Sequence, residues 1–119
     1  MKLTSYKDLE VWKRSISLVN EVYSISRQLP KSEIYGLCSQ IQRSAISIPS
    51  NIAEGYARRG TGEYIRFLSI AFGSSAELET QLIIINQQYP DINLNEANSL
   101  LSEVQKMLYS LMKKLNPLA

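Results

Sequence analysis

Apolar residues recur every three or four positions along most of the chain, the spacing that predicts amphipathic α-helices. Glycine and proline interrupt this pattern at Pro30, at Gly60 with Gly62, and at Pro90. The breaks divide the chain into four helical segments, about residues 6–28, 31–58, 61–88 and 94–115. Because the connections are short, successive helices are expected to pack antiparallel. The pattern predicts one all-α domain over residues 1–119, an up-down-up-down four-helix bundle.

Capping residues and one internal proline refine these segments. Ser5–Asp8 and Asn93–Glu96 are typical of sequences that cap the start of a helix. Gly60 can adopt the left-handed conformation that ends a helix. Pro49 lies inside the second segment, where a proline removes a backbone donor. The apolar stripe keeps its phase across this proline, so the second helix is expected to be one helix kinked at Pro49.

Polar side chains beside the internal proline have two interpretations, and the sequence leaves both open. Ser47, Ser50 and Asn51 can donate hydrogen bonds to the carbonyl that the proline frees. Gln40, Asn51 and Glu54 can instead pair across a contact between copies of the chain.

The first and third segments each carry two adjacent apolar stripes, whereas a helix in a four-helix core needs only one. In the first segment the stripe assigned to the core contains Leu9, Trp12, Ile16, Val19 and Tyr23. The surplus stripes are expected to be exposed on a monomer and covered in a homo-oligomer. Their residues are Val11, Leu18, Val22 and Ile25 in the first segment and Ile65, Phe72 and Ile83 in the third.

The composition removes most catalytic chemistry. There is no histidine and one cysteine, Cys38, which excludes histidine-based triads, Glu-x-x-His di-iron sites and an internal disulfide. Cys38 lies on an apolar stripe and is expected to be a buried core residue. A carboxylate-only metal site would need Glu54, Glu63 and Glu77 to converge, and capping or surface pairing is the favoured role for them. We therefore expect no enzymatic activity, no cofactor and no metal.

The sequence gives no sign of a membrane or a targeting signal. The longest uninterrupted apolar run, Leu82–Ile85, is far shorter than a bilayer span. Residues 1–8 lack the apolar core of a targeting segment. A single cysteine fits a reducing compartment. A cytoplasmic protein with no membrane partner is expected.

Charge is distributed unevenly, although the net charge is only +2. Residues 67–105 contain five acidic residues and no basic ones. The basic residues before them predict a surface that contacts the phosphates of RNA or DNA. The candidate contacts are Lys13, Arg14, Arg43, Arg58, Arg59 and Arg66. The alternative is a solvated surface whose cations pair with carboxylates of the same chain, such as Glu54.

Four stretches of the sequence resemble one known protein family. Gly36–Gly55 is similar to the central signature of small helical proteins encoded in intervening sequences of bacterial 23S ribosomal RNA genes. Asp8–Trp12, Leu29–Glu33 and Ala71–Thr80 match the same family in the same order. The resemblance covers about residues 6–90.

This resemblance implies an antiparallel four-helix bundle that assembles into a ring-like homopentamer. The chain is also similar to the accessory protein of diversity-generating retroelements, a basic pentameric bundle that binds a reverse transcriptase and nucleic acid. The expected function is a non-enzymatic oligomeric scaffold that binds RNA, DNA or a reverse-transcriptase-like enzyme through a basic face. The alternative is a protein-binding or structural adaptor with no nucleic-acid role.

Overall fold

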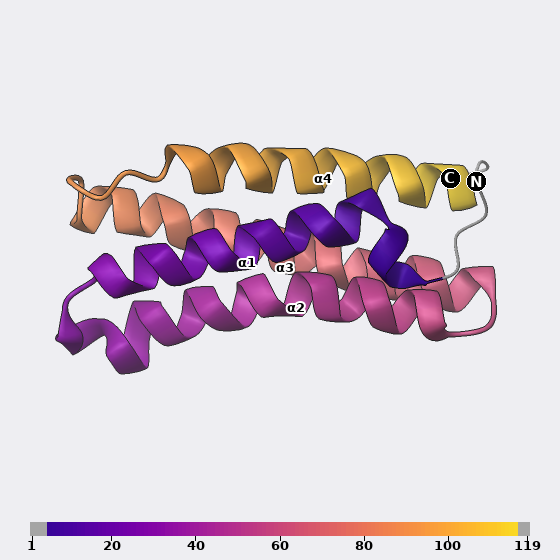
Figure 1. Cartoon of the computed structure of the whole chain (residues 1–119), viewed down its shortest axis with the longest axis horizontal. Helices are drawn as coiled ribbons and strands as arrows, with labels where there is room; N and C mark the ends of the chain where they lie inside the picture. Colours follow the sequence, from indigo (N-terminus) through magenta and orange to yellow (C-terminus); the bar gives the residue numbers. More distant parts are fainter. Residues whose placement is uncertain (1–4, 117–119) are drawn as a thin grey trace.

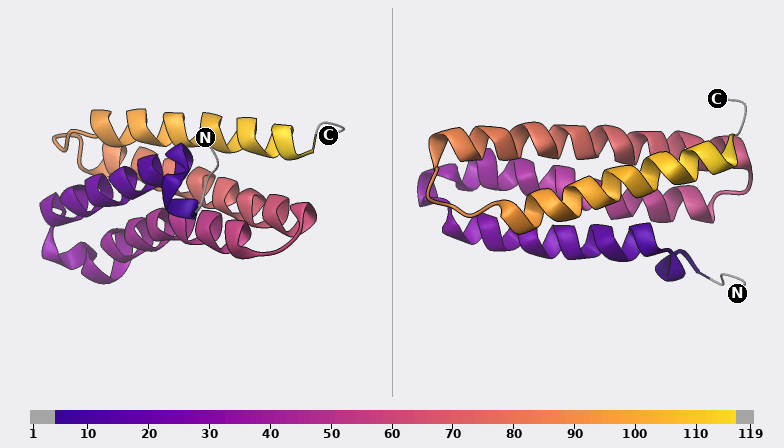
Figure 2. Two further views of the ribbon diagram at one scale, coloured as in Figure 1. Left: turned by 45° about the vertical axis from the view of Figure 1, so that its right-hand side comes forward. Right: turned by 90° about the horizontal axis from the view of Figure 1, so that it is seen from above.

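The computed structural model describes residues 5–116, which form an all-α bundle of four antiparallel helices (Figure 1). The helices are α1 (Glu10–Gln28), α2 (Ser39–Ala57), α3 (Thr61–Gln88) and α4 (Asn95–Leu115). Neighbour contacts run α1–α2, α2–α3, α3–α4 and α4–α1, as short connections require. Seen from above, α4 lies across α1 and α3 (Figure 2). The predicted fold class is confirmed. Pro117 lies outside the described residues.

The core is aliphatic and runs the length of the bundle. Each helix contributes fully buried side chains, among them Leu18, Ile41, Leu78 and Leu108. Helix α3 buries one face, which contains Leu68, Ala71, Ser75, Leu78, Gln81, Leu82 and Ile85. By length and composition alone it would also suit a membrane-spanning helix, with a mean hydropathy of 1.2 over one window. The core helix of a bundle can pass the same test, and 39% of this window is buried inside the bundle.

Helix α1 buries the stripe predicted to meet another copy. Val11 is only 5% exposed, and Leu18, Val22 and Ile25 are fully buried. They belong to the core of this chain, so the prediction that they are exposed on a monomer is wrong. The other stripe is half-buried beside the core and contains Leu9, Trp12, Ile16, Val19 and Tyr23. The two stripes are adjacent and similarly apolar, so spacing alone does not decide which one faces α2 and α4.

The break in the second segment lies at Gly36. A short 3-10 turn and a π turn (Ile34–Cys38) precede α2, and Gly36 has a non-helical φ of −113° and ψ of −110°. Glu33 ties this connection together, because its Oε1 accepts a hydrogen bond from the backbone N–H of Leu37 at 3.4 Å. Its Oε2 accepts one from the hydroxyl of Tyr89, at the end of α3, at 2.6 Å.

Helix α2 runs through Pro49 as one continuous α-helix, and the kink expected at this proline is not shown. Beside it, Asn51 Nδ2 donates to the carbonyl oxygen of Ser47 at 2.7 Å and to its hydroxyl at 2.9 Å. The Ser47 hydroxyl is also 2.8 Å from that of Ser74 on α3. These hydrogen bonds therefore connect successive turns of α2 with each other, and α2 with α3.

Helices α2 and α3 pack tightly at Gly55. A Cβ at this position would lie 2.8 Å from Phe67 Cβ and 3.1 Å from Tyr64 Cδ1, inside van der Waals contact. In the turn that follows, Gly60 has a φ of 125°, a conformation that favours glycine. This agrees with the positive φ expected there, although Gly60 lies two residues beyond Arg58, the C-cap of α2.

Both predicted capping sequences form hydrogen bonds close to a helix start. Ser5 Oγ accepts from the backbone N–H of Lys7 at 3.1 Å, but it caps a 3-10 turn (Tyr6–Asp8) rather than α1 itself. Asn93 Oδ1 accepts from the backbone N–H of Asn95, the first residue of α4, at 2.9 Å.

Candidate nucleic-acid interface

Three of the predicted cations gather where α2 turns into α3. Arg58 and Arg59 lie in the turn, and Arg66 lies in the second turn of α3. The Cζ atoms of Arg58 and Arg66 are 5.0 and 5.5 Å from the centre of the Phe67 ring. The ring holds both guanidinium groups by cation–π contact. The sequence predicted these arginines but not the aromatic ring that spaces them.

The C-terminal turn of α4 adds two more cations to the same end of the bundle, at the right of Figure 1. Lys113 and Lys114 lie there, and Lys113 Nζ is 5.6 Å from the centre of the Tyr109 ring. We call this end, defined by Arg58, Arg59, Lys113 and Lys114, the basic end. The sequence analysis did not include these lysines among the phosphate contacts, because basic residues are common in the last turn of any helix.

Carboxylates of the same chain already pair with four of the six predicted cations. The pairs are Lys13–Glu10 at 3.5 Å, Arg14–Glu103 at 3.4 Å, Arg58–Glu54 at 3.0 Å and Arg66–Glu63 at 3.5 Å. Each pair is half exposed, and such pairs contribute about 0–1 kcal/mol, so a phosphate can compete for the cation. Arg43 and Arg59 form no ion pair with any residue from 5 to 116.

Arg43 is separated from the basic end. It lies fifteen residues before Arg58 on α2, about 22 Å along the helix. There it lines a polar groove of about 530 Å³ between α2 and α3 with Glu77. Lys13 and Arg14 lie at the start of α1, at the same end of the bundle as Arg58.

Buried hydrogen bonds connect the two helices along this polar groove. Ser44 Oγ donates to Gln81 Oε1 at 2.7 Å, and Gln81 Nε2 donates to Gln40 Oε1 at 3.5 Å. Ser44 is 3% exposed and Gln81 is 7% exposed. Gln40, Asn51 and Glu54 therefore each have a partner within the chain.

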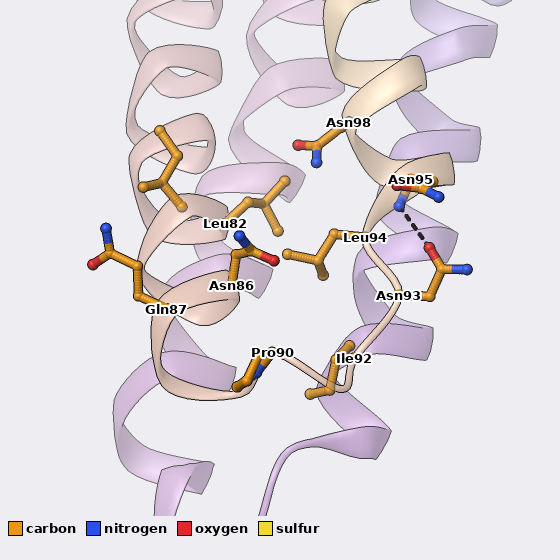
Figure 3. A pocket seen from close by; sticks show the side chains of 10 residues that line it. Leu82, Asn86, Gln87, Pro90, Ile92, Asn93, Leu94, Asn95 and Asn98 are labelled. Atoms are coloured by element: carbon orange, nitrogen blue, oxygen red, sulfur yellow. Dashed lines mark hydrogen bonds between the residues drawn. The ribbon is translucent and has the colours of Figure 1, made fainter.

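The opposite end of the bundle carries an open pocket of about 470 Å³ beside the α3–α4 turn (Figure 3). Amide side chains, including Asn86 and Asn98, surround an apolar floor that contains Leu82 and Leu94. All its polar lining side chains are amides, so it offers hydrogen bonds but no cation to a phosphate. Sequence spacing did not point to this pocket, because its amides come together only through the turn.

Two apolar surfaces lie on opposite sides of the bundle. The α1/α2 face surrounds a groove of about 300 Å³ and includes Trp12, Ile16, Val19, Ile46, Pro49 and Ala53. The α3/α4 face surrounds two hollows of about 330 and 310 Å³ and includes Ile65, Phe72, Tyr109 and Met112. Of the residues predicted to meet another copy, Ile65 and Phe72 are half-buried and Ile83 is 54% exposed.

The one cysteine of the chain, Cys38, is buried in the core. The Cys38 thiol donates to the carbonyl of Ser26 at 3.5 Å, and burial, aided by the charge of Glu33, raises its pKa. A thiol in this state is a poor nucleophile at neutral pH. Within residues 5–116, no three of the cysteine and carboxylate side chains are grouped so that they could hold a metal ion.

Comparisons with known proteins agree with this fold. The model of the 23S rRNA-intervening sequence protein family matches residues 7–110. A crystal structure of a protein of unknown function of the S23 ribosomal protein family, from Bacteroides thetaiotaomicron, is similar with a TM-score of 0.75 and 23% identity. The match covers 87% of this chain and 98% of the other. A search of curated proteins found no match. The chain belongs to the 23S rRNA-intervening sequence protein family.

Proposed function

We propose that this protein is a non-enzymatic homo-oligomeric scaffold, with five copies, whose basic end contacts the phosphates of RNA or DNA. A nucleic-acid enzyme of the reverse-transcriptase kind is a further partner of the same scaffold. The observation that carries the nucleic-acid role is the gathering of Arg58, Arg59, Lys113 and Lys114 at one end of the bundle.

Two apolar surfaces support the oligomeric state. Ile46 is 41% exposed on the α1/α2 face and Tyr109 is 58% exposed on the α3/α4 face. Exposed apolar patches of this kind mark contacts with other proteins. Repetition of the chain would also repeat its basic end, and the electrostatic attraction for a polyanion grows with each copy.

A salt-titrated binding assay with structured RNA and duplex DNA tests the nucleic-acid role. Log affinity should fall linearly with log salt, because each neutralised phosphate releases a counterion. The double variant R58A/R59A should weaken binding to all sequences alike and flatten the slope, since phosphate contacts do not read sequence.

Arg59 and Arg43 provide a matched pair of single variants. Both are exposed and unpaired among residues 5–116, but only Arg59 lies at the basic end. Arg59→Ala should flatten the salt slope and Arg43→Ala should leave it unchanged. Equal effects of the two variants would show that net charge alone governs binding, and would contradict a contact at the basic end.

The second candidate is a protein-binding adaptor with no nucleic-acid role. The four intramolecular ion pairs favour it, because they neutralise cations that a phosphate contact would use. If the intact oligomer shows no salt-dependent binding to any nucleic acid, the adaptor is the better description.

A further inference from the structure

We propose that the polar groove between α2 and α3 binds a free α-amino acid with an amide side chain. Arg43 binds the carboxylate of this ligand, and Glu77 binds its ammonium group. The groove has a volume of about 530 Å³, within the range of small-molecule sites. All the side chains that line it are polar, namely Gln40, Arg43, Ser44, Ser47, Glu77 and Gln81. The site lies apart from the basic end and adds small-molecule binding to the proposed scaffold.

Two contacts between α2 and α3 close the groove at its ends. At one end Gln81 Nε2 donates to Gln40 Oε1 at 3.5 Å. At the other end the hydroxyls of Ser47 and Ser74 are 2.8 Å apart. Seven residues separate the two contacts on each helix, from 40 to 47 on α2 and from 74 to 81 on α3, a rise of about 10 Å. The groove therefore has the length of a small molecule rather than of a polymer.

Arg43 and Glu77 lie opposite each other on the two walls between these contacts. On each helix the charged residue lies three positions after the first contact residue and four positions before the second. Positions three and four apart share a helix face, so both charged residues belong to the facing surfaces. Both are exposed, and neither forms an ion pair with any residue from 5 to 116. The groove thus presents one cation and one anion at the same level.

This arrangement of charges matches a zwitterion better than a ligand with a single charge. The ammonium and carboxylate groups of an α-amino acid are attached to one carbon atom, so each can reach a different wall. A guanidinium group binds a carboxylate with two parallel hydrogen bonds. A phosphate would also meet Arg43, but its negative charge would lie against Glu77. The same repulsion excludes the backbone of a nucleic acid from this groove.

The buried polar groups of the groove favour an amide side chain on the ligand. Ser44 and Gln81 are both buried, and the Ser44 hydroxyl donates to Gln81 Oε1 at 2.7 Å. Gln81 Nε2 carries two hydrogens, and its one acceptor among residues 5–116 is Gln40 Oε1. The second hydrogen can therefore be donated to the carbonyl oxygen of a ligand amide. L-Glutamine and L-asparagine carry this amide together with the zwitterionic group.

Ligand-observed NMR titrations of the intact wild-type protein would test the proposal. L-Glutamine or L-asparagine should bind saturably. Two analogues of glutamine each lack one charge: 4-aminobutanamide has no carboxylate, and glutaramic acid has no ammonium group. Each analogue should bind at least about tenfold more weakly than L-glutamine, because a hydrogen bond between charged groups is lost.

Variants of the two walls would test the assigned roles. Arg43→Ala and Glu77→Gln should each weaken L-glutamine binding at least about tenfold, and both positions are exposed enough for the chain to fold. Glu77→Gln should not weaken the binding of glutaramic acid, which has no ammonium group to lose. The matched controls are Arg59→Ala and Glu96→Gln, at exposed residues outside the groove, and they should leave binding unchanged.

Three results would overturn the proposal. The first is that neither amino acid binds up to its solubility limit. The second is that an analogue with one charge binds as tightly as L-glutamine. The third is that the control variants weaken binding as much as the groove variants, which would show a general effect of net charge. None of these results would bear on the basic end or on self-association, because the groove uses neither.

Discussion

Replacement of Gly55 by alanine should destabilise the fold although alanine favours helices. Gly55 is buried in α2, and the added Cβ would lie 2.8 Å from Phe67 Cβ and 3.3 Å from the Tyr64 carbonyl oxygen. Neither the Phe67 Cβ nor the backbone can move without moving α3. The substitution should therefore push α2 and α3 apart beside the arginines of the basic end.

The size of the effect follows from two opposing terms. Alanine in place of glycine inside a helix contributes about 1 kcal/mol. Overpacking of a tight contact costs about 1–3 kcal/mol. A Cβ added at Gly73, in α3, would meet no neighbouring side chain or helix within 4 Å, so Gly73→Ala gains the first term without the second. The difference between the two variants isolates the overpacking term of about 1–3 kcal/mol.

Thermal and urea unfolding of both variants at one chain concentration would measure this difference. The concentration must match because association adds to apparent stability. Gly73→Ala should melt above Gly55→Ala by about 4 °C for each kcal/mol. Equal stability of the two variants would show that the close packing at Gly55 leaves room for a methyl group, and would contradict this prediction.

Three further predictions concern polar groups. Ser44→Ala should cost about 1–3 kcal/mol in urea unfolding, because it leaves the buried Gln81 amide without its donor, and Gln81→Leu in the same chain should recover most of the loss. The hydrogen bond to Glu33 raises the pKa of Tyr89 above its usual value, so the protonated hydroxyl stabilises the fold below about pH 10 and this stabilisation is lost as the pH rises. Tyr89→Phe has no such hydroxyl and should therefore show a smaller fall in melting temperature than the wild type between about pH 9 and pH 11. Burial raises the pKa of the Cys38 thiol, so a thiol reagent should label it far more slowly in the native protein than in urea.

The helical spacing predicted most of the fold. The expected third segment coincides with α3 (Thr61–Gln88), and α4 starts within a residue of its predicted position. The break at Gly36 was not predictable from spacing. It depends on Glu33 reaching both Leu37 and Tyr89, a contact between the α1–α2 connection and the end of α3.

The candidate site was predicted less completely, because surface properties depend on how the helices are placed together. The arginines at the α2–α3 turn were recognised because they are adjacent in sequence, whereas Lys113 joins them only through the antiparallel topology. Spacing alone leaves two candidate core stripes in α1, and the one predicted to be the core, which includes Trp12, is only half-buried. Leu18, on the adjacent stripe, is fully buried. Which of the two stripes is buried depends on how α2 and α4 pack against α1.

The bond between Ser44 and Gln81 also determines how far α2 can slide past α3. Aliphatic helices can slip by one turn, about 5.4 Å, and still bury methyl groups against each other. Such a slip would separate the buried Gln81 amide from the Ser44 hydroxyl, at about 1–3 kcal/mol if the amide found no other partner. Since Arg58 follows α2 and Arg66 belongs to α3, this one alignment also sets the spacing of the two guanidinium groups over Phe67. A hydrogen bond in the middle of the bundle thus helps to fix the distance between two cations at its end.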